Sequence, residues 1–273
     1  CNRLKQQNRM NLTKSSTTTA TTTPLKHCLV LDVDHTFLSG VTSDMYNTYH
    51  QTTGGFCQTF TYPPSVKRRA KYMKRAKAEA YAPNATGKMV HYKVPTPDDG
   101  KLLTFFVAVR PCISYLVSRH DELFNKENGT CTILLASAND DERTLAVLEC
   151  LTYEGRTLTE ISNARFIPRA EFLENYEDSR SGSKRIHDMR AWAESQQLLT
   201  KDGTMIFLDD KAPRNCCGTI QDGFDQVFNI SSWDLDESLQ IFEQHLQEPN
   251  LDSVFVPTKD KELMDHVIQL LKR

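Results

Sequence analysis

The sequence contains no apolar run long enough to cross a bilayer and no CxxC pair among its eight cysteines. A membrane span, a zinc site and a disulfide framework are therefore not expected, and reduced thiols indicate an intracellular protein. The chain also lacks an excess of charge of one sign, because 33 Lys and Arg residues face 35 Asp and Glu residues, for a net charge of -2. No long-range field then draws the chain to nucleic acid, and we expect no direct nucleic-acid partner.

Acidic residues are absent from the N-terminal part of the chain, where none precedes Asp32. Residues 1–25 are rich in Thr, Ser, Asn and Lys, a composition that cannot bury a core, so we expect a disordered linker there. A basic, hydroxyl-rich and acid-free segment is also similar to an organelle transit peptide. We therefore expect a nuclear or cytoplasmic location and keep a mitochondrial one as the alternative.

One apolar run, His27–Leu31, ends in two carboxylates, Asp32 and Asp34, which are followed by Thr36. A short apolar run with polar boundaries is typical of a buried parallel strand. Ligands of an open α/β sheet bind beyond the carboxyl ends of such strands. Two carboxylates this close repel each other unless a cation lies between them, and Mg²⁺ is a hard ion that prefers oxygen ligands. A strand that ends in a solvated acidic turn is the alternative.

A second apolar run, Thr204–Leu208, also ends in two carboxylates, Asp209 and Asp210. Two buried strands of one chain that both end in acid pairs are rarely a structural accident. This run is the strongest independent support for a functional site, and we expect the topology to bring the two acid pairs side by side.

The rest of the chain alternates between apolar runs and helical patterns, which predicts an α/β fold with a mostly parallel, Rossmann-like central sheet flanked by helices. An irregular insertion over 40–100, rich in Pro and Gly turn signals, follows the first strand. Further strands are expected at 104–109, 130–137 and 227–230, helices at 111–124, from 139, from 184, at 236–246 and at 259–271, and a loop at 163–183. We expect one domain over 26–250 and a helical C-terminal extension over 251–273.

The segment Asp32-Val33-Asp34-His35-Thr36 resembles the DxDxT signature of haloacid-dehalogenase-type phosphatases. It is most similar to the form found in the FCP/SCP family, whose members dephosphorylate the C-terminal domain of RNA polymerase II and other phosphoproteins. Further matches follow in the family's order, including Arg110-Pro111 and Ser232-Trp233, and they extend over residues 25 to 245. The resemblance implies the haloacid dehalogenase fold with an insertion after the first strand.

The resemblance also implies roles for five residues. Asp32 would attack the phosphorus atom as nucleophile, and Asp34 would act first as general acid and then as general base. The side chains of Asp32 and Asp210 and the main-chain carbonyl of Asp34 would hold Mg²⁺. Lys184 would be a fixed cation near the phosphoryl oxygens, oriented by Asp209.

Three further residues would contact the substrate phosphate, namely Thr36, Arg110 and Ser137. The chain departs from the family at the last of these, because the usual family threonine aligns with Leu135. The nearest hydroxyl is on Ser137, and a shift of two residues keeps the same face of a strand. The alternatives are that Ser137 caps the following helix and that Arg110 is a surface residue.

These residues predict a Mg²⁺-dependent phosphoserine/threonine protein phosphatase that works through an aspartyl-phosphate, with the RNA polymerase II C-terminal domain as one candidate substrate. The second Asp of the signature favours a phosphatase over mutase and ATPase relatives, which generally lack it. Two alternatives stay open. One is a non-catalytic peptide-binding or scaffold relative, such as the presequence-receptor subunit of the mitochondrial inner-membrane translocase, and the other is a small-molecule phosphatase.

The insertion carries a basic run over 67–77 in a weakly amphipathic helical pattern. Three interpretations of this run stay open: a solvated helix face, a platform for acidic phosphorylated substrates, and a nuclear-import or nucleic-acid patch. The expected partner is a phosphorylated protein or peptide, and no oligomeric state is indicated.

Overall fold

The structure, a computed structural model, describes residues 27–49, 57–62, 103–153, 155–173, 183–212, 216–217, 225–247 and 256–273. The N-terminal segment 1–25 and the basic run 67–77 lie outside these ranges, so the interpretations of both stay predictions. Within the described ranges, no helix combines the length and the apolar composition that crossing a bilayer requires.

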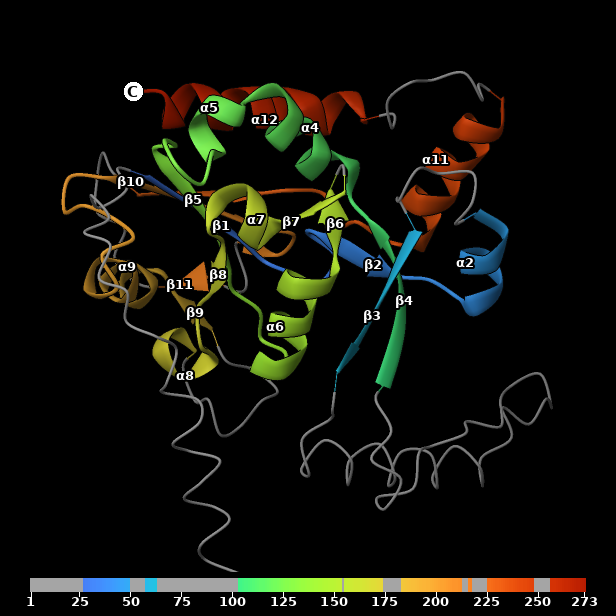
Figure 1. Ribbon diagram of the computed structural model, residues 1–273, viewed down its shortest axis with the longest axis horizontal. Coiled ribbons are helices and arrows are strands. Elements are labelled where there is room, and N and C mark those ends of the chain that lie inside the picture. The colour runs from blue at the N-terminus through green and yellow to red at the C-terminus, as the bar shows by residue number, and fades with distance from the viewer. Residues whose placement is uncertain are drawn as a thin grey trace, which may run out of the picture.

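A five-stranded sheet in the order β12-β10-β1-β5-β8 forms the centre of the described part (Figure 1). Its strands are β1 (His27–Leu31), β5 (Cys131–Leu135), β8 (Arg165–Phe166), β10 (Thr204–Asp209) and β12 (Asp225–Asn229). Every pairing within this sheet is parallel. β1 lies between β5 and β10 and is buried along its whole length, as expected for a strand that is covered on both faces.

Helices cover both faces of the central sheet. Successive side chains of β1 point to opposite faces, and they belong to two different hydrophobic clusters. Leu29 and Leu31 belong to the first cluster, and Cys28 and Val30 belong to the second. The first cluster includes residues of α4 (Pro111–Arg119), α5 (Asp121–Phe124), α6 (Asp141–Cys150), α7 (Leu158–Ser162) and α12 (Thr258–Leu271), and the second includes residues of α8 (Arg169–Phe172) and α9 (Ile186–Ser195). The predicted α/β class with a parallel central sheet flanked by helices is confirmed.

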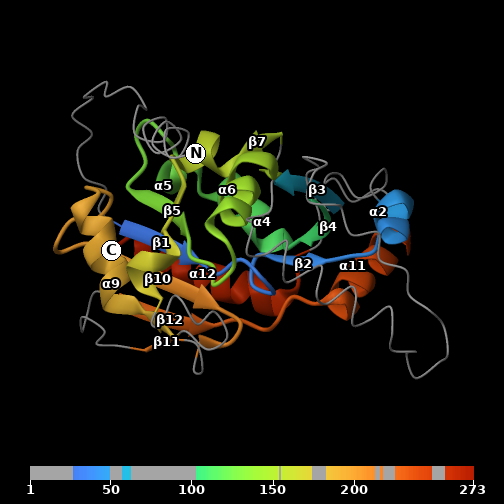
Figure 2. The same ribbon diagram turned by 90° about the horizontal axis from the view of Figure 1, so that it is seen from below.

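A second, antiparallel sheet is built from the strands around the insertion, in the order β2-β4-β3. These strands are β2 (Leu38–Gly40), β3 (Cys57–Tyr62) and β4 (Leu103–Val109). Figure 2 shows this sheet with α2 (Ser43–Tyr49) and α11 (Leu235–Gln247) at the opposite end of the molecule from α9. The strand predicted at 104–109 is therefore present, but it pairs with β3 of the insertion and not with the central sheet.

Local predictions differ from the structure at three places. The helix expected over 111–124 is interrupted at His120, which separates α4 from α5. The segment 163–183, expected to be a loop, contains β8 and α8. Lys184 lies in the short strand β9 (Lys184–Arg185), which pairs with β11 (Cys216–Cys217), and α9 begins only at Ile186. The remaining strands are β6 (Thr152–Tyr153) and β7 (Arg156–Thr157).

The C-terminal helix α12 belongs to the core and does not form a separate extension. Met264, Val267, Ile268 and Leu271 recur at helical spacing, and all four are buried in the first hydrophobic cluster. A boundary near residue 250 therefore does not separate α12 from the sheet that carries the site.

Candidate active site

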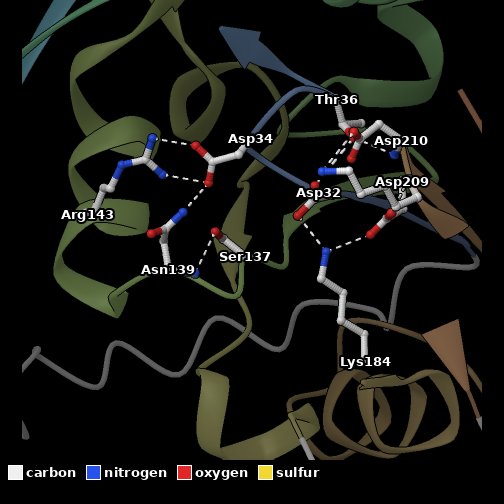
Figure 3. Close-up of polar contacts among 10 residues, drawn as sticks. Asp32, Asp34, Thr36, Ser137, Asn139, Arg143, Lys184, Asp209 and Asp210 are labelled. Atoms are coloured by element: carbon white, nitrogen blue, oxygen red, sulfur yellow. Dashed lines mark hydrogen bonds and ion pairs between the residues drawn. The ribbon is translucent and has the colours of Figure 1, made fainter. Parts of the chain in front are cut away.

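The two acid pairs meet at the carboxyl ends of neighbouring strands (Figure 3). β1 and β10 pair in parallel with Leu31 opposite Leu208, so Asp32 and Asp209 follow at the same level. The main-chain N–H of Asp32 continues the ladder by donating to the carbonyl of Leu208 at 2.9 Å. The topology thus places the pairs side by side, as the sequence predicts.

The acidic side chains form a group that fits a divalent metal ion. Asp32, Asp209 and Asp210 each offer a carboxylate oxygen, and these oxygens lie within 4.8 Å of one another. The side chain of Asp210 is 3% exposed, and its Oδ2 has no hydrogen-bond partner within the described ranges. The Lys211 ammonium lies 3.7 Å from this oxygen. A buried carboxylate oxygen without a donor beside two further carboxylates is suited to Mg²⁺, which prefers oxygen ligands.

Asp209 is engaged by other groups. Its Oδ2 accepts a hydrogen bond from the ammonium of Lys184 at 2.6 Å, and its Oδ1 accepts one from the main-chain N–H of Lys211 at 2.7 Å. Asp209 is completely buried, so both contacts are shielded from water. Asp209 thus contacts Lys184 directly, and its orienting role toward the lysine stays a prediction.

Lys184 lies between Asp32 of the first acid pair and Asp209 of the second. Its ammonium donates to Oδ1 of Asp32 at 2.6 Å as well as to Asp209, and its side chain is 3% exposed. Burial disfavours the charged ammonium, but the carboxylates of Asp32 and Asp209 outweigh burial and raise the pKa of Lys184 above its ordinary value. The lysine therefore stays charged in the buried site.

Asp32 has an excess of negative neighbours. Burial raises the pKa of its carboxyl above the ordinary value, Lys184 opposes the rise, and Asp209 and Asp34 add to it. The attraction of Lys184, which is shared between Asp32 and Asp209, does not offset the burial of Asp32 and the repulsion by its acidic neighbours. A second cation at the metal position would remove this imbalance.

The hydroxyl of Thr36 connects the two strand ends. Its Oγ1 accepts a hydrogen bond from the main-chain N–H of Asp210 at 2.9 Å and lies 3.4 Å from Oδ2 of Asp32, toward which it can donate. Thr36 is 2% exposed. The structure therefore places Thr36 where it positions the proposed metal ligands, and its predicted contact with the substrate phosphate stays a prediction.

Asp34 lies on the other side of the site, away from Lys184 (Figure 3). Arg143 of α6 donates to both of its oxygens, at 2.6 Å to Oδ1 and 2.9 Å to Oδ2. The side-chain amide of Asn139 also donates to Oδ2. The guanidinium lies 5.6 Å from the centres of the Phe60 and Phe105 rings, which belong to the antiparallel sheet.

The sequence pattern does not predict Asn139 and Arg143 as site residues. The acidic residues at the start of the same helix fit its N-terminus, and they gave no reason to single out a nearby arginine. The contact also depends on how α6 packs against the insertion, which no local pattern encodes.

Ser137 is buried and lies between the two halves of the site in Figure 3. Leu135 of β5 pairs with Leu31 of β1. Ser137, two residues after Leu135, therefore corresponds in the strand register to Val33, two residues after Leu31. Its Oγ accepts the main-chain N–H of Asn139 at 3.1 Å, which closes the turn before α6. The first residue of α6 is Asp141, so Ser137 stabilises this turn and is not the helix cap. Its predicted role toward phosphate stays a prediction.

Arg110 is not retained as a phosphate ligand. It is completely buried, and its guanidinium makes five hydrogen bonds: two to the carboxylate of Asp260, two to Ser231 and one to the carbonyl of Thr36. A guanidinium has five N–H donors, so no donor remains for a substrate. Arg110 instead connects α12 to the loop that carries Thr36.

Breaking this ion pair from one side is expected to destabilise the fold. Arg110→Met leaves the buried Asp260 carboxylate unpaired, and the free energy of unfolding should fall by about 3–5 kcal/mol. Urea unfolding measures the loss, and the double variant Arg110→Met/Asp260→Leu should recover much of it. A double variant whose loss equals the sum of the two single losses would show that the two residues are not coupled.

No known protein family matches the sequence in a comparison with family models, and no curated protein matches it. Two solved structures show a distant similarity. A variant of the fission yeast RNA polymerase II CTD phosphatase Fcp1, bound to beryllium fluoride, is 10% identical with a TM-score of 0.41, and the match covers 98% of this chain but only 65% of that one. The HAD domain of the Legionella pneumophila effector Lem4 is 12% identical with a TM-score of 0.32, over 84% and 98% of the two chains. Similarity of this degree supports no conclusion about function, which has to come from the site itself.

Proposed function

We propose that this protein is a Mg²⁺-dependent phosphatase of the haloacid dehalogenase type that hydrolyses phosphoserine or phosphothreonine in proteins. The observation that carries the proposal is the pairing of Asp32 with the buried Lys184, next to the Asp210 oxygen to which no described residue donates a hydrogen bond. This arrangement joins a nucleophile, a fixed cation and an open metal ligand at the carboxyl edge of the central sheet. Mg²⁺ held by Asp32, Asp210 and the main-chain carbonyl of Asp34 would neutralise charge on the phosphoryl oxygens.

The reaction follows from the chemistry of the side chains. A carboxylate oxygen of Asp32 attacks phosphorus, the bond from phosphorus to the serine oxygen breaks, and an aspartyl-phosphate forms. Asp34 gives its proton to the leaving oxygen. Asp34 then takes a proton from water, which attacks the aspartyl-phosphate, releases phosphate and restores the Asp32 carboxylate. Lys184 stays charged throughout and stabilises the negative charge that moves between these groups.

A non-catalytic peptide-binding protein is the second candidate, and two observations favour it. Leu135 occupies the place of the family threonine, and Asp34 is held by Arg143 away from Lys184. Peptide recognition without turnover would not need a general acid.

Hydrolysis of a small aryl phosphate separates these candidates. We expect turnover that stops with a chelator, returns with Mg²⁺ and does not return with Ca²⁺, which prefers longer bonds and more ligands. Comparing a phosphoserine peptide with phosphorylated metabolites then distinguishes a protein phosphatase from a small-molecule one. Full activity in the chelator would refute the metal site, and no turnover with any metal or substrate would favour the binding protein.

Asp210→Asn is expected to raise the Mg²⁺ concentration needed for half-maximal activity by at least about 10-fold, because an amide is a weaker ligand for a hard cation. A Mg²⁺ titration of aryl phosphate hydrolysis measures the change. Asp121→Asn, which alters an exposed aspartate at the start of α5, is the matched control and should leave the titration unchanged. An unchanged requirement in Asp210→Asn would remove Asp210 from the metal site.

A further inference from the structure

Arg143 and Asn139 together form a built site for a planar oxyanion, here named the Arg143–Asn139 site. The guanidinium presents two parallel N–H donors, and the Asn139 amide adds a third. The Arg143 side chain is 6% exposed, and two aromatic rings lie near its guanidinium. A bidentate arginine that is mostly shielded from water binds carboxylates and phosphates strongly and with defined geometry.

Asp34 occupies this site in the structure, although the proposed reaction needs Asp34 at another place. As general acid, Asp34 has to reach the leaving oxygen of a phosphoryl group attached to Asp32. In the structure both oxygens of Asp34 accept hydrogen bonds from Arg143, and the carboxylate points away from Lys184 (Figure 3). Held in this way, the carboxylate of Asp34 is turned away from the place where it would have to meet the leaving oxygen.

The folded protein loses stability if Asp34 leaves the Arg143–Asn139 site and no other anion replaces it. Leaving a largely buried guanidinium without its bidentate carboxylate strongly destabilises the folded protein. Exchange with a second oxyanion preserves the charge pairing and the hydrogen bonds. The Asp34 side chain is 31% exposed, so a substrate approaching from solvent can reach the pair from the Asp34 side.

We propose that the Arg143–Asn139 site binds a second anionic group of the substrate, and that this group displaces Asp34 toward the leaving oxygen. The inference rests on the proposed phosphatase function and defines its substrate class. The preferred substrate is a phosphoserine or phosphothreonine peptide with a carboxylate or a second phosphate next to the phosphorylated residue. Substrates without a second anion leave Asp34 on Arg143 and are hydrolysed slowly.

Three substrates and two variants test this inference. The substrates are a phosphoserine peptide with Glu beside the phosphoserine, the same peptide with Gln in that place, and a neutral aryl phosphate. For the unmodified protein we expect kcat/KM for the Glu peptide to exceed that for the Gln peptide by about 10-fold or more, the size of effect that a charged group bound by a built polar site produces.

Arg143→Gln should reduce the preference between the two peptides to within about 2-fold, because the bidentate partner is gone. It should also raise the rate on aryl phosphate, because Asp34 is no longer held away from the leaving oxygen. Arg156→Gln, which alters an exposed arginine of β7, is the matched control and should keep the preference. If Arg143→Gln does not fold, as judged by circular dichroism, Arg143→Lys keeps the charge without the fork and should reduce the preference at least about 3-fold.

The outcomes separate the two proposals. Equal hydrolysis of both peptides by the unmodified protein would overturn the second-anion site and leave the phosphatase intact. An Arg143 variant that keeps the peptide preference would also overturn it. An Arg143 variant that is folded but loses aryl phosphate activity would overturn it too and would make Arg143 a residue that positions Asp34 for catalysis. No turnover of any of the three substrates would overturn both proposals.

Discussion

Asp32→Asn is expected to lower kcat on aryl phosphate by at least about 10³-fold, because an amide cannot replace the carboxylate nucleophile in covalent catalysis. The dependence of the residual rate on Mg²⁺ concentration should also differ from that of the unmodified protein, since the Asp32 side chain is a proposed metal ligand. A variant with nearly full activity would refute the assignment of the nucleophile. Asp121→Asn again serves as the control for a change of one carboxylate to an amide on the surface.

The same substitution should not cost stability in the absence of metal. Burial raises the pKa of Asp32 above its unfolded value, so the charged carboxylate is disfavoured in the folded state. The destabilisation of the folded state by this charged carboxylate begins as the pH rises above the pKa of Asp32 in the unfolded chain. It is complete above the raised pKa of Asp32 in the folded protein. In a chelator at pH 8, the neutral Asn should therefore leave the melting temperature equal or higher. A lost activity together with an unchanged or raised melting temperature would identify Asp32 as a residue kept for function.

The acid pairs were predictable because the information is local. Each pair directly follows a short apolar run, and parallel strands bring their carboxyl ends to one edge of the sheet. Lys184 was placed through the family resemblance, and the structure brings its ammonium to Asp32 and Asp209.

The contacts of Arg110 and Arg143 could not be predicted because each partner is far away in the sequence. Asp260 lies 150 residues after Arg110, and Arg143 lies 109 residues after Asp34. The family resemblance at Arg110-Pro111 implied a contact with the substrate phosphate, but the packing of α12 supplies the carboxylate of Asp260 that binds the guanidinium. In the same way, the pairing of β4 with β3 depends on the insertion and not on the apolar pattern of β4 itself.

Lys184→Met is expected to lower kcat by about 10²–10³-fold, the range found when a fixed donor to transition-state charge is removed. It should also destabilise the metal-free protein by about 3–5 kcal/mol, because the carboxylates of Asp32 and Asp209 remain buried without their cation. Added Mg²⁺ should restore part of the lost stability by pairing with Asp32, but it should not restore kcat, since the metal does not occupy the place of the ammonium.

A double variant distinguishes a catalytic lysine from a structural counterion. Lys184→Met/Asp209→Asn removes the ammonium together with the completely buried carboxylate that it neutralises, so most of the stability should return. If Lys184 acts on the phosphoryl group, kcat should stay as low as in Lys184→Met. If kcat recovers along with the free energy of unfolding, the lysine serves only to balance the charge of Asp209. The two measurements respond differently because stability depends on the sum of the buried charges, whereas catalysis depends on a positive charge at one place beside Asp32.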